Sequence, residues 1–167
     1  MGIKLQGQVS WVLTVIYTNP HSHIRDWLWQ ELQGFAIDCM KPWLLAGDYN
    51  ETISLEECNH GGPDMRRRCN RFKQWIENNG LIDLGYSGPK FTWARGLPHD
   101  TQKEARLDRA LCNDTWRVKF LEGAVRHLLQ AGSDHSTVVD IDWGFYQATI
   151  VQYPVSLPSG VDNSFHV

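Results

Sequence analysis

The chain has 167 residues, of which 42% are hydrophobic, including eight tryptophans, and this predicts a packed domain of ordinary size while excluding a disordered chain. Its formal net charge is -3, so no global basic field points to a nucleic-acid partner. Four cysteines without CxxC spacing predict reduced thiols in an intracellular protein, and no apolar run is long enough to cross a membrane.

The first part of the chain predicts an α/β unit. β-branched and aromatic residues mark a strand at Val9–Thr18. A helix follows it, with Ser22 as the predicted N-cap and apolar residues at helical spacing. Lys41–Pro42 ends this helix, and the next strand is Trp43–Gly47, whose residues are all apolar or glycine, as burial on both faces requires. This order of elements predicts an α/β architecture.

The elements further along are shorter. Asp64 is the predicted N-cap of a second helix, which Gly80 ends, and Asn113 is the predicted cap of a third. The predicted strands are Leu81–Leu84, Lys90–Ala94, Arg106–Leu111, Gly123–Leu128 and Ser136–Asp142. Together these elements predict a layered α/β sandwich rather than a Rossmann repeat. Residues 144–167, which contain no Lys or Arg, are predicted to form an unstructured tail.

A carboxylate and a carboxamide follow the predicted strand Trp43–Gly47. Alternation along an extended chain aims Asp48 and Asn50 in one direction, while Tyr49 points the other way. A buried strand that delivers two polar groups to one place is a common support for a catalytic site. The alternative is that Asp48 and Asn50 merely satisfy a turn, which both residue types do well.

Other polar side chains lie at or near strand ends. Tyr17 ends the first strand, Asp108 lies within a strand between two arginines, and Asp134 and His135 directly precede the last predicted strand. Together with Asp48 and Asn50 this inventory suits a divalent hard cation and a phosphate. Each residue also has a structural explanation. Asp108 could be an exposed salt-bridge partner, His135 a core imidazole and Tyr17 a core aromatic.

Five motifs stand in a characteristic order. They are Tyr17–Thr18–Asn19–Pro20, Gly47–Asp48–Tyr49–Asn50, Phe91–Thr92–Trp93, Arg106–Leu107–Asp108–Arg109 and Ser133–Asp134–His135. This order resembles the endonuclease/exonuclease/phosphatase superfamily, and in particular the apurinic-endonuclease-like domain of plant non-LTR (LINE-type) retrotransposons. The resemblance covers roughly Val9 to Asp142. It implies a DNase I-like α/β sandwich, with residues 1–143 as a partial domain of this family.

The resemblance also implies catalytic roles. Asp48 would deprotonate the attacking water, and Asn50 would hold that water and the scissile phosphate in line. His135 would stabilise charge on the phosphoryl oxygens, with Asp108 fixing its orientation. If the strands converge as this implies, Asp48 and His135 lie within about 10 Å of each other, the span of a bridging phosphate and water.

The remaining implications concern the metal, the substrate and the location. Tyr17 would contact the phosphate, and Asp134 would lie beside a Mg²⁺ or Mn²⁺ ion. The implied substrate is DNA, and the implied location of a functional protein is the nucleus. A reverse transcriptase domain is expected in a full-length parent element, but this sequence has none.

The chain departs from the family pattern before Tyr17. The family fold opens with further strands that carry an Asn and the Glu that is the principal metal ligand, whereas Met1–Ile16 contains no Asp, Glu or Asn. We therefore expect an N-terminally truncated domain with weak metal binding and impaired nuclease activity. Two alternatives are a catalytically inactive remnant that at most binds nucleic acid or a protein partner, and an enzyme for inositol phosphates or phospholipid headgroups.

Five cations lie on the second predicted helix. They are Arg66, Arg67, Arg68, Arg71 and Lys73. The apolar stripe of that helix takes its buried face, so most of these charges must face solvent. They form either an ordinary solvated surface or a contact with the DNA backbone.

Overall fold

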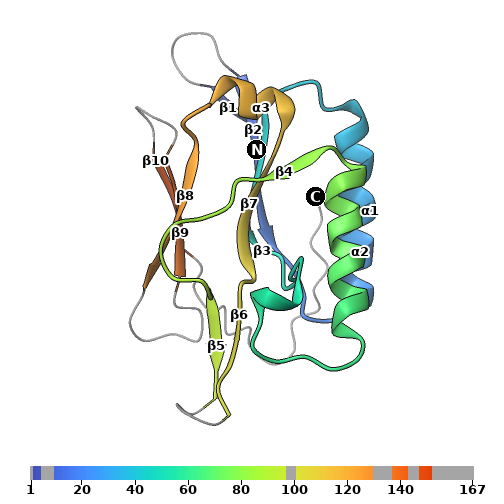
Figure 1. Cartoon of the computed structure of the whole chain (residues 1–167). Helices are drawn as coiled ribbons and strands as arrows, with labels where there is room; N and C mark the ends of the chain where they lie inside the picture. Colours follow the sequence, from blue (N-terminus) through green and yellow to red (C-terminus); the bar gives the residue numbers. More distant parts are fainter. Residues whose placement is uncertain (1, 5–9, 97–100, 130–136, 143–146, 152–167) are drawn as a thin grey trace, which may run out of the picture.

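The computed structural model describes residues 2–4, 10–96, 101–129, 137–142 and 147–151, which form three layers (Figure 1). The central sheet has the order β1 (Gly2–Lys4), β2 (Ser10–Tyr17), β3 (Trp43–Asp48), β7 (Asp108–Asn113) and β4 (Leu81–Asp83). The second, antiparallel sheet consists of β10 (Gln147–Val151), β9 (Thr137–Asp142) and β8 (Ala124–Leu129). A hairpin of β5 (Trp93–Arg95) and β6 (Lys103–Ala105) projects from one end. The predicted layered α/β sandwich is confirmed.

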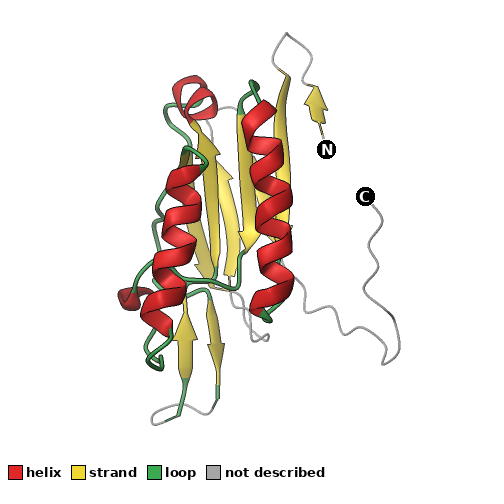
Figure 2. Ribbon diagram, turned by 90° about the vertical axis from the view of Figure 1, so that its right-hand side faces the viewer, coloured by secondary structure: helices red, strands yellow, loops and turns green. Residues whose placement is uncertain are grey.

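Two long helices, α1 (Ser22–Asp38) and α2 (Met65–Asn78), cover one face of the central sheet (Figure 2). Aromatic side chains fill the space beneath them, since the Trp29 ring lies 5.3 Å from Phe72 and 4.6 Å from Trp75 between centroids. The Trp75 indole N–H donates to the Trp29 carbonyl at 3.0 Å, which satisfies a buried polar group and ties the two helices together. None of the described helices has the length and apolar character needed to span a bilayer.

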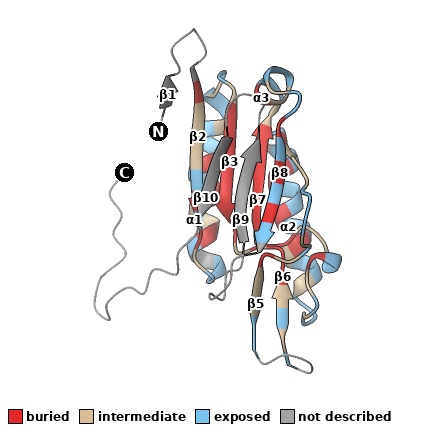
Figure 3. Ribbon diagram, turned by 90° about the vertical axis from the view of Figure 1, so that its left-hand side faces the viewer, coloured by how far each residue is buried: buried red, intermediate tan, exposed pale blue. Residues whose placement is uncertain are grey.

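The opposite face of the central sheet packs on the second sheet. All six residues of β3 are buried, and Figure 3 shows β3 and β7 as buried strands within the sandwich. Trp11, Leu44 and Trp116 belong to the core on this side, together with Val125 from β8. Because both faces of the sheet are covered, the predicted strand Trp43–Gly47 contains only apolar residues and glycine, and the first charged residue is Asp48 at the end of β3.

Two helix starts test the predicted caps. Asn113 begins α3 (Asp114–Lys119), and its side-chain oxygen accepts from Trp116 N at 3.0 Å, as predicted, and also from Trp43 N at 2.9 Å. Ser22 is instead the first residue of α1, and the cap position belongs to His21. The His21 N–H donates to the Asn19 side chain at 2.9 Å, so the preceding turn holds this position, and α1 begins one residue earlier than the predicted N-cap implies.

Two other predicted segments differ from the structure. The strand predicted at Lys90–Ala94 is shifted to Trp93–Arg95, where it pairs with β6 in the register Trp93↔Ala105. The prediction of an unstructured tail over 144–167 is wrong for Gln147–Val151, which forms β10 and pairs with all but the first residue of β9. The last three residues of this segment are β-branched, which suits a strand. Residues 152–167 lie outside the described part of the chain.

The backbone of β2 passes so close to Gly47 that only glycine fits there. Gly47 has φ +140°, and an added Cβ would collide with the Ile16 carbonyl oxygen. We expect Gly47→Ala to lower the free energy of unfolding by about 2 kcal/mol or more, because a clash adds to an unfavourable φ.

The matched control is Gly34→Ala, since Gly34 lies within α1 and has no atom within 4 Å of an added Cβ. This change should raise the free energy of unfolding by up to about 1 kcal/mol. Urea unfolding followed by circular dichroism measures both variants. Equal effects of the two changes would show that the close approach of β2 and β3 has no energetic weight.

Candidate active site

Three of the predicted site residues lie side by side on neighbouring strands. β2 and β3 are parallel with Tyr17 opposite Asp48, and β3 and β7 are antiparallel with Asp48 opposite Asp108. The strand-end alignment predicted for these three residues is therefore present. Two further predicted residues, Asp134 and His135, lie outside the described residues.

Asp48 and Asn50 contact each other directly. The Asp48 carboxylate accepts from Asn50 N at 2.7 Å and from Asn50 Nδ2 at 2.9 Å. The same amide nitrogen donates to the Thr18 carbonyl at 2.8 Å, and Asn50 has a left-handed backbone with φ 47°. Asp48 therefore closes a turn, and both residues also line one cleft. Tyr49 points into the helix-side core, as predicted.

The Asp48 carboxyl group is 1% exposed, and its environment favours the protonated form. Burial is the main cause, the charge of Asp108 adds to it, and together they raise the pKa of Asp48 to about 8. The hydrogen bond from the Asn50 backbone and the charge of Arg25 act in the opposite direction. A group with a pKa near neutrality can exchange a proton with a substrate, which is what a general base requires.

Asp108 is also buried, and it is not the exposed salt-bridge partner that was one of the alternatives. Burial raises the pKa of Asp108 to about 6, whereas the Thr92 hydroxyl and the charges of Arg109 and Arg106 act to lower it. The Thr92 hydroxyl oxygen accepts from the backbone N–H groups of Leu107 and Asp108 at 2.9 and 3.0 Å. One Asp108 oxygen, Oδ2, is buried and has no hydrogen-bond partner among the described residues, so it can accept from a further group.

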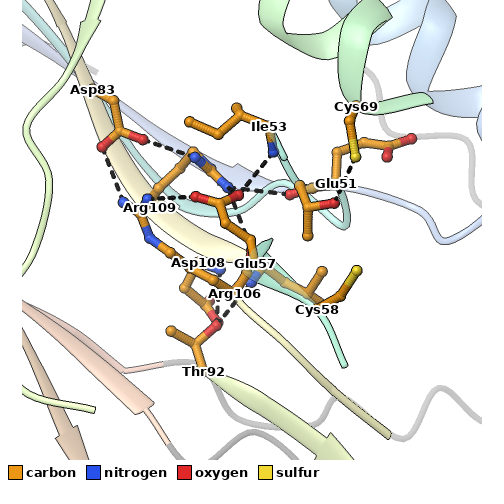
Figure 4. Close-up of polar contacts among 12 residues, drawn as sticks. Glu51, Ile53, Glu57, Cys58, Cys69, Asp83, Thr92, Arg106, Asp108 and Arg109 are labelled. Carbon is orange, nitrogen blue, oxygen red and sulfur yellow. Dashed lines mark hydrogen bonds and ion pairs between the residues drawn. The ribbon is translucent and has the colours of Figure 1, made fainter. Parts of the chain in front are cut away.

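The two arginines that flank Asp108 pair with other carboxylates (Figure 4). Arg106 donates to Glu57 at 2.8 Å and to Asp83 at 3.0 Å. Arg109, which is fully buried, donates to the same two carboxylates at 2.7 Å each. We call these four residues the four-charge ring. Although burial acts to raise the pKa of Asp83, the two arginines hold it below its ordinary value, so the Asp83 carboxylate remains ionised.

Sequence analysis did not single out Glu57 or Asp83 as partners of these arginines. They precede Arg109 by 52 and 26 positions. Arg25 and Glu51 were missed in the same way, and they form a second buried ion pair. The only available signal was chemical, because a charge within an otherwise apolar segment requires a partner.

A cleft of about 360 Å³ lies beside these residues. Its walls include Tyr17, Asp48 and Asn50, together with Trp93 and His60. The His60 and Trp93 rings lie 5.9 Å apart between centroids. The cleft thus combines acidic and amide groups with an aromatic wall, which suits a ligand that carries both a phosphate and an apolar ring.

The donor set of the site fits a divalent cation in its chemistry. Mg²⁺ and Mn²⁺ prefer oxygen ligands, and Asp48, Asp108 and the Asn50 amide oxygen supply such atoms. The unpartnered Oδ2 of Asp108 is a buried carboxylate oxygen that a cation or a proton donor would satisfy. Within the described ranges, no three His, Cys, Asp or Glu side chains are grouped to hold a metal.

Comparison with known proteins agrees with this arrangement. Residues 4–135 match the model of the endonuclease/exonuclease/phosphatase family. The chain belongs to this family. Among solved structures it resembles the endonuclease domain of TRAS1, a telomere-specific non-LTR retrotransposon, with a TM-score of 0.60 and 18% sequence identity. The match covers 85% of this chain and 61% of the TRAS1 domain, which shows a shared DNase I-like fold. No curated protein matches the sequence.

The raised pKa of Asp48 predicts a pH dependence of stability. The folded chain keeps the Asp48 proton to about pH 8, whereas the unfolded chain loses it near pH 3.8. Stability from this group is therefore complete below about pH 4 and falls as the pH rises towards 8. Asp48→Asn removes this dependence. The free energy of unfolding of the variant minus that of the unmodified chain should therefore be larger at pH 8 than at pH 4, by at least about 1 kcal/mol.

Urea unfolding in EDTA at several pH values measures this difference. Asp64→Asn is the control, because Asp64 is an exposed carboxylate whose side chain makes no cap hydrogen bond. The control should follow the unmodified chain at every pH. Parallel curves for Asp48→Asn and the unmodified chain would show that Asp48 is ionised in the folded protein.

Proposed function

We propose that this chain is a divalent-metal-dependent endonuclease of non-LTR retrotransposon origin that hydrolyses phosphodiester bonds in DNA. The observation that carries the proposal is the strand register, which aligns Tyr17, Asp48 and Asp108 beside one cleft in a member of this family. Phosphodiester hydrolysis needs a positioned water, a base and contacts that stabilise charge on the phosphoryl oxygens. Action on chromosomal DNA would place the protein in the nucleus.

Asp48 and Asn50 are suited to hold the attacking water. Asp48 has a pKa of about 8 and takes the proton of the water once it is itself deprotonated. The Asn50 amide nitrogen is already engaged by Asp48 and by the Thr18 carbonyl, so its oxygen is the atom available for the cleft. An amide oxygen accepts hydrogen bonds, and Asn50 therefore suits the water better than the phosphate.

The other residues have complementary roles in this proposal. Tyr17 is 62% exposed, and its hydroxyl group can donate to a phosphate oxygen. The unpartnered Asp108 Oδ2 suits an N–H of the His135 imidazole, which would then face the phosphate with its other nitrogen. Asp134 would hold the metal, and a bound Mg²⁺ or Mn²⁺ supplies positive charge to the phosphate oxygens. We further propose that cleavage is slow, since residues 1–16 carry no carboxylate to strengthen metal binding.

Plasmid nicking tests the proposal. The purified chain should convert supercoiled plasmid to the open circular form slowly at millimolar Mg²⁺ and not at all in EDTA. The rate should increase from about pH 6 to about pH 9, because the base must lose its proton. Asp48→Ala should reduce the rate by at least about 100-fold, whereas the exposed-site control Asp64→Ala should retain it.

Two results would contradict this function. Nicking that survives Asp48→Ala would come from a contaminating nuclease. If the folded chain does not nick at any pH tested, with Mg²⁺ or with Mn²⁺, the endonuclease hypothesis is wrong and an inactive remnant is the better description.

A second prediction concerns the cations of α2. Arg68, Arg71 and Lys73 are paired with Glu51, Asp26 and Glu77. Arg66 and Arg67 are exposed, form no ion pair with any described residue, and lie between Met65 and Arg68, which line the cleft. We propose that these two arginines contact the DNA backbone at the edge of the cleft.

Replacing both by glutamine should weaken DNA binding and reduce the slope of log K against log salt concentration by about one unit per lost phosphate contact. Fluorescence anisotropy with a labelled duplex in EDTA measures both quantities without cleavage. Lys73→Gln, two turns further along the same helix, is the matched control and should leave the slope unchanged. If affinity and slope stay constant in the double variant, this end of α2 is an ordinary solvated surface.

A further inference from the structure

One buried arginine links two segments of the candidate active site. Arg25 lies in the first turn of α1, and its side chain is 1% exposed. One of its terminal nitrogens donates to the carbonyl oxygens of Asn19 and Pro20 at 2.8 and 2.5 Å. These two carbonyls belong to the turn that directly follows Tyr17. The other terminal nitrogen forms an ion pair with Glu51, the residue that follows Asn50.

Glu51 is itself held from two sides. Its carboxylate accepts from Arg25 and also from Arg68 of α2, at 3.3 Å from Nε and 3.1 Å from Nη2. Arg25 and Glu51 are both buried, so loss of one partner would leave an unpaired buried charge. A guanidinium group can serve the carbonyls and the carboxylate together because its donors form a rigid planar fork, which a lysine ammonium lacks.

The segments that Arg25 links are those that determine the position of Asn50. Asn50 has a left-handed backbone, and it directly precedes the anchored Glu51. Its amide nitrogen bridges the Asp48 carboxylate and the Thr18 carbonyl, and Thr18 lies at the start of the turn that Arg25 binds. A shift of either segment would therefore move the Asn50 amide away from Asp48.

We propose that Arg25 is a positioning residue for the reaction, which acts through Glu51 and the 19–20 turn to hold Asn50 and Tyr17 in productive geometry. The proposal rests on the endonuclease function proposed above. Arg25 does not line the cleft, and it does not touch substrate in this scheme. Its loss should therefore reduce kcat while changing KM for DNA little, because ground-state binding of the duplex is made by other groups.

The experiment compares Arg25→Lys and Glu51→Gln with Arg71→Lys. Arg71 pairs with Asp26 across the same two helices at 2.6 Å, but its side chain is 56% exposed and no hydrogen bond joins it to the site among the described residues. Plasmid nicking gives kcat and KM per folded molecule, with the folded fraction taken from circular dichroism. The Asn50 side-chain amide signal in a ¹H–¹⁵N spectrum, assigned with Asn50→Asp, reports its position without any reaction.

Arg25→Lys and Glu51→Gln should each lower kcat by about 10-fold or more, with KM changed by less than about 3-fold. Both should shift the Asn50 amide signal, and Arg71→Lys should change neither quantity. Partial recovery of kcat in Arg25→Ala on addition of guanidinium ion would further support the role. If the two variants fold but keep both kcat and the Asn50 signal of the unmodified chain, Arg25 has a purely structural role and the proposal is wrong.

Failure of the proposed function gives a different pattern. In that case the unmodified chain does not nick DNA, and the Asn50 signal alone decides whether Arg25 positions the site. If Arg25→Lys does not fold, Glu51→Gln decides, since it keeps an oxygen acceptor for Arg25 and is the milder change.

Discussion

The four-charge ring is the interaction on which the candidate site depends. Arg106 and Arg109 share the carboxylates of Glu57 and Asp83, which fastens the loop after β3 and the strand β4 to β7. Burying charges is costly unless every one is paired, and removal of one partner typically costs roughly 3–5 kcal/mol. Because Arg106 and Arg109 are occupied in this way, neither forms an ion pair with Asp108 between them. That carboxylate keeps a free oxygen for the site.

The second constraint is the register of three strands. Close contact at Gly47 brings β2 against β3, and it lets Tyr17 and Asp48 end at the same level. The antiparallel β7 then places Asp108 on the other side of Asp48. When two buried carboxylates are adjacent, the charge of one makes ionisation of the other less favourable. A proton or a cation is therefore needed nearby to offset their negative charge. The chemistry we propose thus follows from strand pairing, and the buried arginines keep the connecting loops from relaxing it.

Much of this arrangement could be predicted from local patterns. The strand Trp43–Gly47, the opposite directions of Tyr49 and its neighbours, and the Asn113 cap all follow from spacing of three residues or fewer. The carboxylate partners of Arg25, Arg106 and Arg109 are separated from them by 23 to 52 positions, and nothing local specifies such pairs. The composition of residues 144–167 does not reveal β10, although its last three residues, Thr149, Ile150 and Val151, are β-branched and suit a strand.

The central claim is that strand ends far apart in the sequence form one catalytic cleft. The most direct test is the distance between the Asp48 carboxylate and the His135 imidazole in crystals of the protein grown with a short DNA duplex. The account predicts a separation within about 10 Å, which one phosphate and one water can bridge. A separation clearly beyond that distance, with β2, β3 and β7 paired as described, would contradict it.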